Sequence, residues 1–190
     1  MIIKQGTEDG LINRQKTTWP PDGTGAVINT SYLNWGCYGA ANDYHIYRSY
    51  LRFNTSSIPA GATITSAKLW LKLRDKQNVD NFNVQAQVWR DNGDWNPLDT
   101  GDWGCGDTLI ATKNYADLPD IGQWFSIDIP VDQINKSGIT AFEIRGDHES
   151  GTAPTGWNIG SPYTAETSGS EPYLEISYIL PGAILLMFLG

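Results

Sequence analysis

Apolar and polar residues alternate with a period of two along much of this chain. The clearest example is residues 67–74, where leucines at every second position alternate with lysines and an arginine. Successive side chains of a β-strand point to opposite faces, so this pattern predicts a strand with one buried face. No long segment shows the spacing of an amphipathic helix. The pattern therefore predicts a chain built of strands.

Nine segments are predicted as strands. The clearest six are residues 49–53, 67–74, 82–89, 124–129, 140–145 and 173–178, and three weaker ones are residues 2–4, 25–29 and 108–112. Residues 131–136, which follow a proline, are predicted to form one helical turn. Clusters of Gly, Pro, Asp and Asn separate these segments at intervals of roughly ten to twenty residues, as in β-sandwiches.

The length of 190 residues suits one domain with a sizeable core. Aromatic residues make up 12% of the chain and charged residues only 18%, which favours a packed β-protein over a disordered one. We therefore predict an antiparallel all-β sandwich of jelly-roll type over residues 1–180, with long loops rich in Gly, Trp and Asp. Residues 181–190 are predicted to form an apolar C-terminal arm.

The formal net charge of −8 repels phosphate backbones and anionic lipids, so nucleic acid is not an expected partner. Residues 1–10 lack the pattern of a secretory signal. Two explanations stay open: a signal was removed, or the protein leaves its cell by lysis or within a particle. The start at Met1 favours the second.

The apolar arm is too short to span a membrane, which takes roughly 20 apolar residues. A water-exposed run of this composition would promote aggregation, so we expect it to pack against its own domain or against a neighbouring subunit. The candidate assembly contacts are Ile184, Leu185, Leu186, Met187, Phe188 and Leu189.

The two cysteines, Cys37 and Cys105, each lie in a segment rich in Gly and Trp. A disulfide between them would close a long loop and stabilise the fold by about 4 kcal/mol. A lone pair of cysteines has no diagnostic spacing, so two unpaired thiols in neighbouring loops are an equal alternative.

Catalytic motifs are not evident. His45 and His148 have no metal-ligand spacing, and no Gly-x-Ser-x-Gly elbow occurs. Pairs of carboxylates can be drawn by chance among 21 acidic residues. We therefore predict that the protein is not an enzyme.

Five aromatic residues fall in predicted loops among Gly, Asn and Asp: Trp35, Tyr38, Trp95, Trp103 and Trp157. Aromatic rings beside amides and carboxylates can stack on sugar rings and bind their hydroxyls, so these residues are candidates for binding polysaccharide. The alternative is that they pack under the loops.

Four aspartates form a candidate calcium site: Asp91, Asp94, Asp99 and Asp102. They supply hard oxygen ligands around a glycine turn, as calcium prefers. Their spacing does not match an EF-hand, and Asp residues also form turns without metal. A metal-free loop is thus the favoured alternative.

Residues 47–71 resemble the signature of the DNRLRE (disaggregatase-related) family, in which a strand R-x-Y-L-x-F leads into S-S-I-P-x-G-A-x-I-x-S-A-x-L-x-L. Val88 with Trp95 and Trp103, the strand at 123–129 and the closing strand at 171–178 resemble further parts of that family in the same order. The resemblance implies a jelly-roll sandwich similar to carbohydrate-binding modules, found in secreted or surface proteins and in some phage structural proteins. It implies no catalytic residues.

Two functions are consistent with these features. We favour a structural surface protein of an extracellular assembly, such as a phage decoration or tail-surface protein or a filament subunit, whose arm contacts its own copies or other structural subunits. The alternative is an adhesion module that recognises cell-surface polysaccharide.

Overall fold

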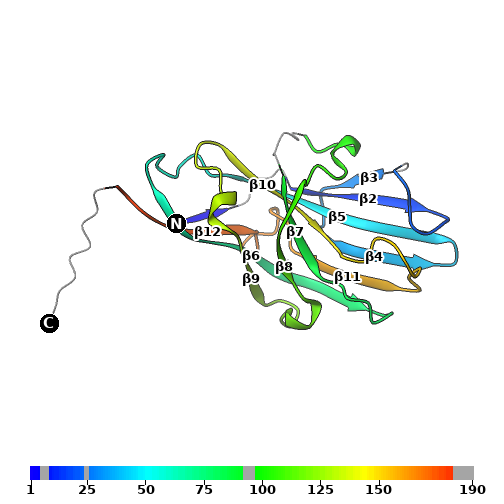
Figure 1. Cartoon of the computed structure of the whole chain (residues 1–190). Helices are drawn as coiled ribbons and strands as arrows, with labels where there is room; N and C mark the ends of the chain where they lie inside the picture. Colours follow the sequence, from blue (N-terminus) through cyan, green and yellow to red (C-terminus); the bar gives the residue numbers. More distant parts are fainter. Residues whose placement is uncertain (5–8, 24–25, 92–96, 182–190) are drawn as a thin grey trace.

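The computed structural model describes residues 1–4, 9–23, 26–91 and 97–181 of the chain (Figure 1). These residues form twelve strands and three short 3₁₀ helices. All strands that are hydrogen-bonded neighbours run antiparallel to each other. The predicted all-β antiparallel fold is confirmed. Within the described part of the chain, none of the helices has the length and apolar character needed to cross a membrane.

The strands follow one another along the chain with short helices between the later ones. Their order is β1 (Ile2–Lys4), β2 (Gly10–Lys16), β3 (Ala26–Asn29), β4 (Trp35–Ala40), β5 (Asp43–Asn54), β6 (Thr63–Asn78), β7 (Ala86–Asp91), η1 (Thr100–Asp102), β8 (Thr108–Lys113), η2 (Tyr115–Asp117), β9 (Trp124–Asp128), η3 (Val131–Gln133), β10 (Ile139–Arg145), β11 (Trp157–Pro162) and β12 (Tyr173–Ile179).

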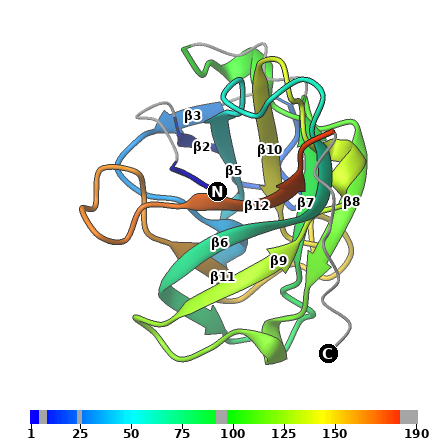
Figure 2. The same ribbon diagram turned by 90° about the vertical axis from the view of Figure 1, so that its left-hand side faces the viewer.

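The long strand β6 links two layers of sheet. Its first part pairs with β12 and β9, and its last part pairs with β11. In the second layer β5 is central, since it pairs with β2, β4 and β10, and β7 and β8 continue from β10. Figure 2 shows β12, β6 and β9 in front of β5 and β10.

The main core lies between these layers. Leu69, Leu71 and Leu73 of β6 face inward with no exposed surface, and Leu51 and Phe142 of the second layer are equally buried. This is the alternation that the sequence pattern predicts for residues 67–74. Replacing one such side chain by alanine lowers the free energy of unfolding by about 2–5 kcal/mol, so the core accounts for much of the stability of the sandwich.

The predicted strands all occur, but one is shorter than expected and three strands were not predicted. Residues 82–85 of the predicted segment 82–89 are not strand, and the predicted helical turn is the 3₁₀ helix η3. The strands β2, β4 and β11 were missed. In β4 and β11 the glycines suggested loops, because glycine is uncommon inside strands.

Those glycines are needed for close packing and not for turns. A Cβ atom at Gly160 would collide with the Trp35 ring, and one at Gly36 would collide with the backbone carbonyl of Asn158. Gly36 also has a φ of 109°, which side chains other than glycine rarely adopt. Glycine in β4 and β11 therefore allows strands and a large aromatic ring to pack closely.

Candidate functional site

The prediction that five aromatic residues lie in loops is wrong for three of them. Trp35 and Tyr38 lie in β4, and Trp157 lies in β11. Trp35 is fully buried in the core, where its ring contacts Phe125 edge-on at 6.4 Å between centroids. Trp95 is outside the described residues. Trp35 is therefore a core residue and has no surface to offer a sugar.

Trp103 does lie in a loop, but the protein's own cations contact its ring. The guanidinium carbons of Arg14 and Arg48 are each 4.1 Å from the ring centroid. Arg48 also pairs with Glu143, which is fully buried and accepts a further hydrogen bond from the Gly106 backbone N–H. This arrangement anchors the loop after β7 to the sheet, on the face of β5 opposite to Tyr47.

The two cysteines are free thiols, so of the two alternatives the structure has the unpaired thiols and not the disulfide. Cys37 lies inside β4 and not in a loop, and burial raises the pKa of its thiol to about 12. The Cys105 thiol donates a hydrogen bond to Asp91 Oδ2 at 2.8 Å, and burial raises its pKa also. Both sulfurs are therefore protonated and poorly nucleophilic at neutral pH.

The carboxylates of the candidate calcium site are engaged in other contacts. Asp99 caps η1 by accepting a hydrogen bond from the Gly101 N–H at 2.6 Å, and Asp102 accepts one from the Asp99 N–H at 2.7 Å. Asp91 contacts Cys105, while Asp94 is outside the described residues. Within the described ranges, no three His, Cys, Asp or Glu side chains lie close enough together to hold a metal ion.

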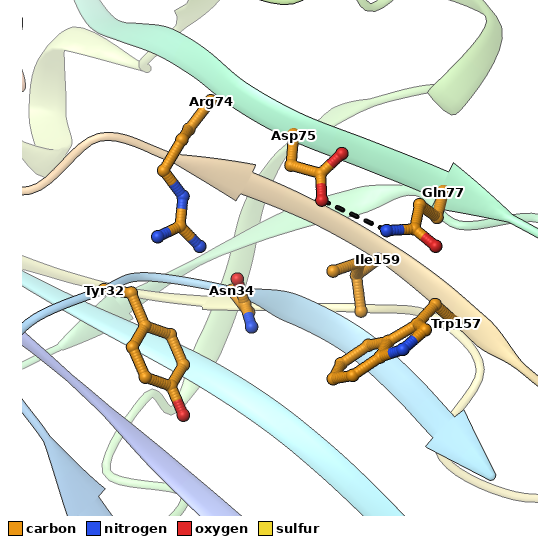
Figure 3. Close-up of a pocket in the computed structure, with 7 residues that line it drawn as sticks. All are labelled: Tyr32, Asn34, Arg74, Asp75, Gln77, Trp157 and Ile159. Carbon is orange, nitrogen blue, oxygen red and sulfur yellow. Dashed lines mark hydrogen bonds between the residues drawn. The ribbon is translucent and has the colours of Figure 1, made fainter. Parts of the chain in front are cut away.

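A hollow of about 360 Å³ lies on the outer face of β6 and β11 (Figure 3). Three residues come from the end of β6, two from β11 and two from the segment before and at the entry to β4. They are Tyr32, Asn34, Arg74, Asp75, Gln77, Trp157 and Ile159.

A β-bulge places two consecutive side chains of β6 in this hollow. The pairing with β11 shifts between Ser161 and Pro162, so that Leu73 is opposite Pro162 but Asp75 is opposite Ser161. The extra residue interrupts the strict alternation of faces. Leu73 consequently points into the core, while Arg74 and Asp75 both reach the hollow.

Asn34 is the most informative residue of the hollow. Its side chain is only 4% exposed, yet the amide oxygen Oδ1 has no hydrogen-bond partner among the described residues. A buried polar group without a partner costs about 1–3 kcal/mol. At the lining of a hollow, such an oxygen is free to accept a hydrogen bond from a ligand.

Aromatic rings continue the hollow across the sheet. Tyr38 is directly opposite Trp157 in the pairing of β4 with β11, and their ring centroids are 4.3 Å apart. The ring of Tyr47 in β5 stacks on Trp157 at 5.9 Å. His45 stacks on Tyr47 at 5.6 Å. Two of the predicted aromatic residues, Tyr38 and Trp157, are thus brought together by strand pairing.

Polar side chains, including one cation and one carboxylate, line the hollow beside its aromatic rings. Arg74 donates two hydrogen bonds to Ser161 Oγ and lies 5.7 Å from the Tyr32 ring centroid. Gln77 Nε2 donates to Asp75 Oδ2 at 3.1 Å, as Figure 3 shows. Donors and acceptors beside aromatic faces are suited to a ligand that has both hydroxyl groups and apolar C–H faces.

The polar side chains that line the hollow can form hydrogen bonds to a ligand. Among the described residues that line it, Asp75 is the one carboxylate, whereas most glycoside hydrolases use a pair of carboxylates. The lining holds no serine, cysteine or histidine that could act as nucleophile or base. These side chains can hold and orient a polar ring.

No protein-family model and no curated protein matches this sequence. The likeness to the DNRLRE family therefore rests on the sequence motifs alone.

Sequence reasoning missed most residues of the hollow. Arg74 was recognised only as a polar position of a strand, and Tyr32, Asn34, Asp75, Gln77 and Ile159 were not singled out. Arg74 carried the strongest available signal, because it belongs to the polar face of the alternating segment 67–74.

Proposed function

We propose that this protein is a non-catalytic carbohydrate-binding module, and that the hollow bounded by Tyr32 and Trp157 holds a sugar unit of a polysaccharide. The single observation that supports this most strongly is the buried amide oxygen of Asn34, which has no hydrogen-bond partner among the described residues and lies in the same hollow as these rings. A sugar hydroxyl can donate to Asn34 Oδ1, and the pyranose C–H face can stack on an aromatic ring.

Retention on an array of immobilised polysaccharides tests this proposal. We expect the intact protein to be retained on at least one polysaccharide, and the Trp157→Ala variant to bind it about tenfold more weakly. The Tyr44→Ala variant is the matched control, because Tyr44 is also half-buried on β5 but points to the face opposite His45 and Tyr47.

Asn34→Ala separates binding from folding. We expect this variant to lose retention while its stability to denaturant stays equal or rises, because the change removes a buried amide oxygen that has no hydrogen-bond partner. A protein that no polysaccharide on a broad array retains would contradict the proposal. Loss of retention together with loss of folding would also count against Asn34 as a binding residue.

Assembly into an extracellular particle or filament is the second candidate function, and one observation favours it. Large apolar side chains are exposed on β1 and at the end of β12: Ile2 is 63% exposed, Ile179 58% and Leu180 50%. β1 is the edge strand of its sheet, and Figure 1 shows it beside β12. Such a surface is suited to contact with another copy of the chain or another structural subunit.

The mass of the protein in solution tests this second function. We expect a multiple of the 21.0 kDa chain by light scattering, and a folded monomer after removal of residues 182–190. Those residues, with the predicted contacts at 184–189, lie outside the described part of the chain. A monomeric intact protein at high concentration would contradict self-assembly.

A further inference from the structure

A second group of aromatic side chains lies on the outer face of the sheet formed by β6, β9 and β12. Trp70 is opposite Tyr173 in the strand pairing, and the two rings stack at 5.9 Å with an interplanar angle of 15°. Trp124 of β9 meets Tyr173 edge-on at 5.2 Å. We call Trp70, Trp124 and Tyr173 the aromatic platform; all three are half-buried.

The aromatic platform and the hollow lie on the same face of β6. Trp70 and Lys72 alternate with the inward-facing leucines, so they point outward. The bulge then keeps Arg74 and Asp75 on that outer face, and Gln77 follows them into the hollow. From Trp70 to Gln77 the strand advances about 23 Å, at about 3.3 Å per residue.

Two cations lie between the aromatic platform and the hollow. Lys72 Nζ is 6.0 Å from the centroid of Trp124 and 5.7 Å from that of Tyr163, and it donates to Ser170 Oγ at 3.1 Å. The Arg74 guanidinium bonds to Ser161 Oγ. Among the described residues neither forms an ion pair with a carboxylate, although the protein is acidic overall.

Aromatic faces and hydrogen-bond donors therefore alternate along one direction of the surface. Cross-strand aromatic pairs such as Trp70 with Tyr173 also stabilise sheets, so stacking alone does not indicate a ligand. What favours a ligand is that the platform shares its face with the hollow, where the amide oxygen of Asn34 has no hydrogen-bond partner among the described residues. A single sugar would occupy the hollow and leave the platform uncovered.

We infer that the aromatic platform and the hollow form one continuous site for an extended polysaccharide chain of several sugar units, which runs along the outer face of β6. This inference rests on the proposed function. Sugar rings stack on the platform and in the hollow, and Lys72 and Arg74 donate to the hydroxyl or carboxyl groups of the units between them.

Binding of size-sorted fragments tests the inference. The probes are fragments from disaccharide to octasaccharide, made by partial acid hydrolysis of a polysaccharide that the array retains, with tryptophan fluorescence as the readout. We expect the octasaccharide to bind at least about tenfold more tightly than the disaccharide, because it reaches both the hollow and the platform.

Trp70→Ala identifies the platform as the source of that difference. We expect this variant to lower octasaccharide affinity about fivefold and to leave disaccharide affinity unchanged. Tyr44→Ala should alter neither. Lys72→Met, which keeps the apolar stem of the side chain but removes the donor, should also weaken only the longer fragments, and it serves if Trp70→Ala fails to fold.

The outcomes distinguish the extended site from the proposed function. Equal affinity for disaccharide and octasaccharide would overturn the extended site while the hollow remained a sugar site. An unchanged octasaccharide affinity in both folded variants would overturn it as well. If the array retains no polysaccharide, the proposed function and this inference fail together.

Discussion

Tyr38 and Trp157 are cross-strand partners whose ring centroids lie 4.3 Å apart, at an interplanar angle of 33°. The pair belongs to β4 and β11, two strands that the glycine-rich sequence does not reveal. Tyr47 and His45 extend the same aromatic group onto β5. This aromatic group, which reaches the hollow at Trp157, therefore exists because three strands pair in one register.

Tyr38 and Trp157 should be energetically coupled in the stability of the fold. In a double-mutant cycle of Tyr38→Ala and Trp157→Ala, we expect a coupling free energy of about 1 kcal/mol, since the rings are in direct contact. Denaturation in urea measures the four stabilities. The control is a cycle of Trp157→Ala with the distant Trp89→Ala, in which the two losses of stability should be additive. If the losses from Tyr38→Ala and Trp157→Ala were also strictly additive, the two rings would not interact.

Gly36 should tolerate no side chain. Gly36→Ala places a Cβ against the carbonyl of Asn158 and also imposes a positive φ on alanine, so we expect a loss of about 3 kcal/mol or more in the free energy of unfolding. Gly122→Ala is the control, because its φ is 84° but a Cβ there meets no atom within 4 Å. It should lose only about 1 kcal/mol. Equal losses in both variants would mean that backbone strain alone matters.

Glu143 should stabilise the fold and hold the loop that carries Trp103 against the sheet. This fully buried carboxylate accepts hydrogen bonds from Arg48 at 3.0 Å and from the Gly106 N–H at 2.8 Å, and it also pairs with Arg145. Glu143→Gln leaves Arg145 without a carboxylate partner among the described residues, whereas Arg48 keeps its ion pair with Glu149. We therefore expect a loss of about 3 kcal/mol, measured by thermal unfolding.

The matched control is Asp107→Asn, which removes the exposed partner of Arg90. We expect its unfolding temperature to stay unchanged, because water solvates both groups of that pair. A Glu143→Gln variant as stable as this control would show that the buried network does not stabilise the fold.

Asp9 should make the stability depend on pH. Its side chain is nearly fully buried, and burial raises its pKa from 3.8 to about 7. The folded state therefore holds the proton more tightly than the unfolded state does. This contribution to stability is fully present below about pH 4 and is lost as the pH rises to about 7, by up to about 4 kcal/mol.

Urea denaturation at about pH 5 and about pH 8 measures this effect. Asp9→Asn cannot ionise, and its amide oxygen can still accept the hydrogen bond that the Ala165 N–H donates to Asp9 at 2.9 Å. We expect the variant to lose less stability than the parent protein between these two pH values. Identical pH profiles would show that Asp9 is not the titrating group.

The strand pattern of this protein could be predicted from the sequence because alternation is a local property. Buried and half-buried residues alternate over residues 67–74 of β6 as the sequence pattern predicts, since neighbouring side chains of any strand face opposite ways. The same local rule failed at β4 and β11. Whether a glycine there marks a turn or a close contact depends on the Trp35 ring and the Asn158 carbonyl, which are distant in sequence.

By itself, then, the sequence determined the all-β antiparallel class, most of the strands and the aromatic character of the surface, because these depend on composition and on a two-residue period. Only the tertiary structure decided which aromatic residues are exposed together. It buried Trp35, joined Tyr38 to Trp157, and used one bulge to place Arg74 and Asp75 in the same hollow as the unpartnered amide oxygen of Asn34. Those relations depend on strand register, which is set by packing across the whole sheet.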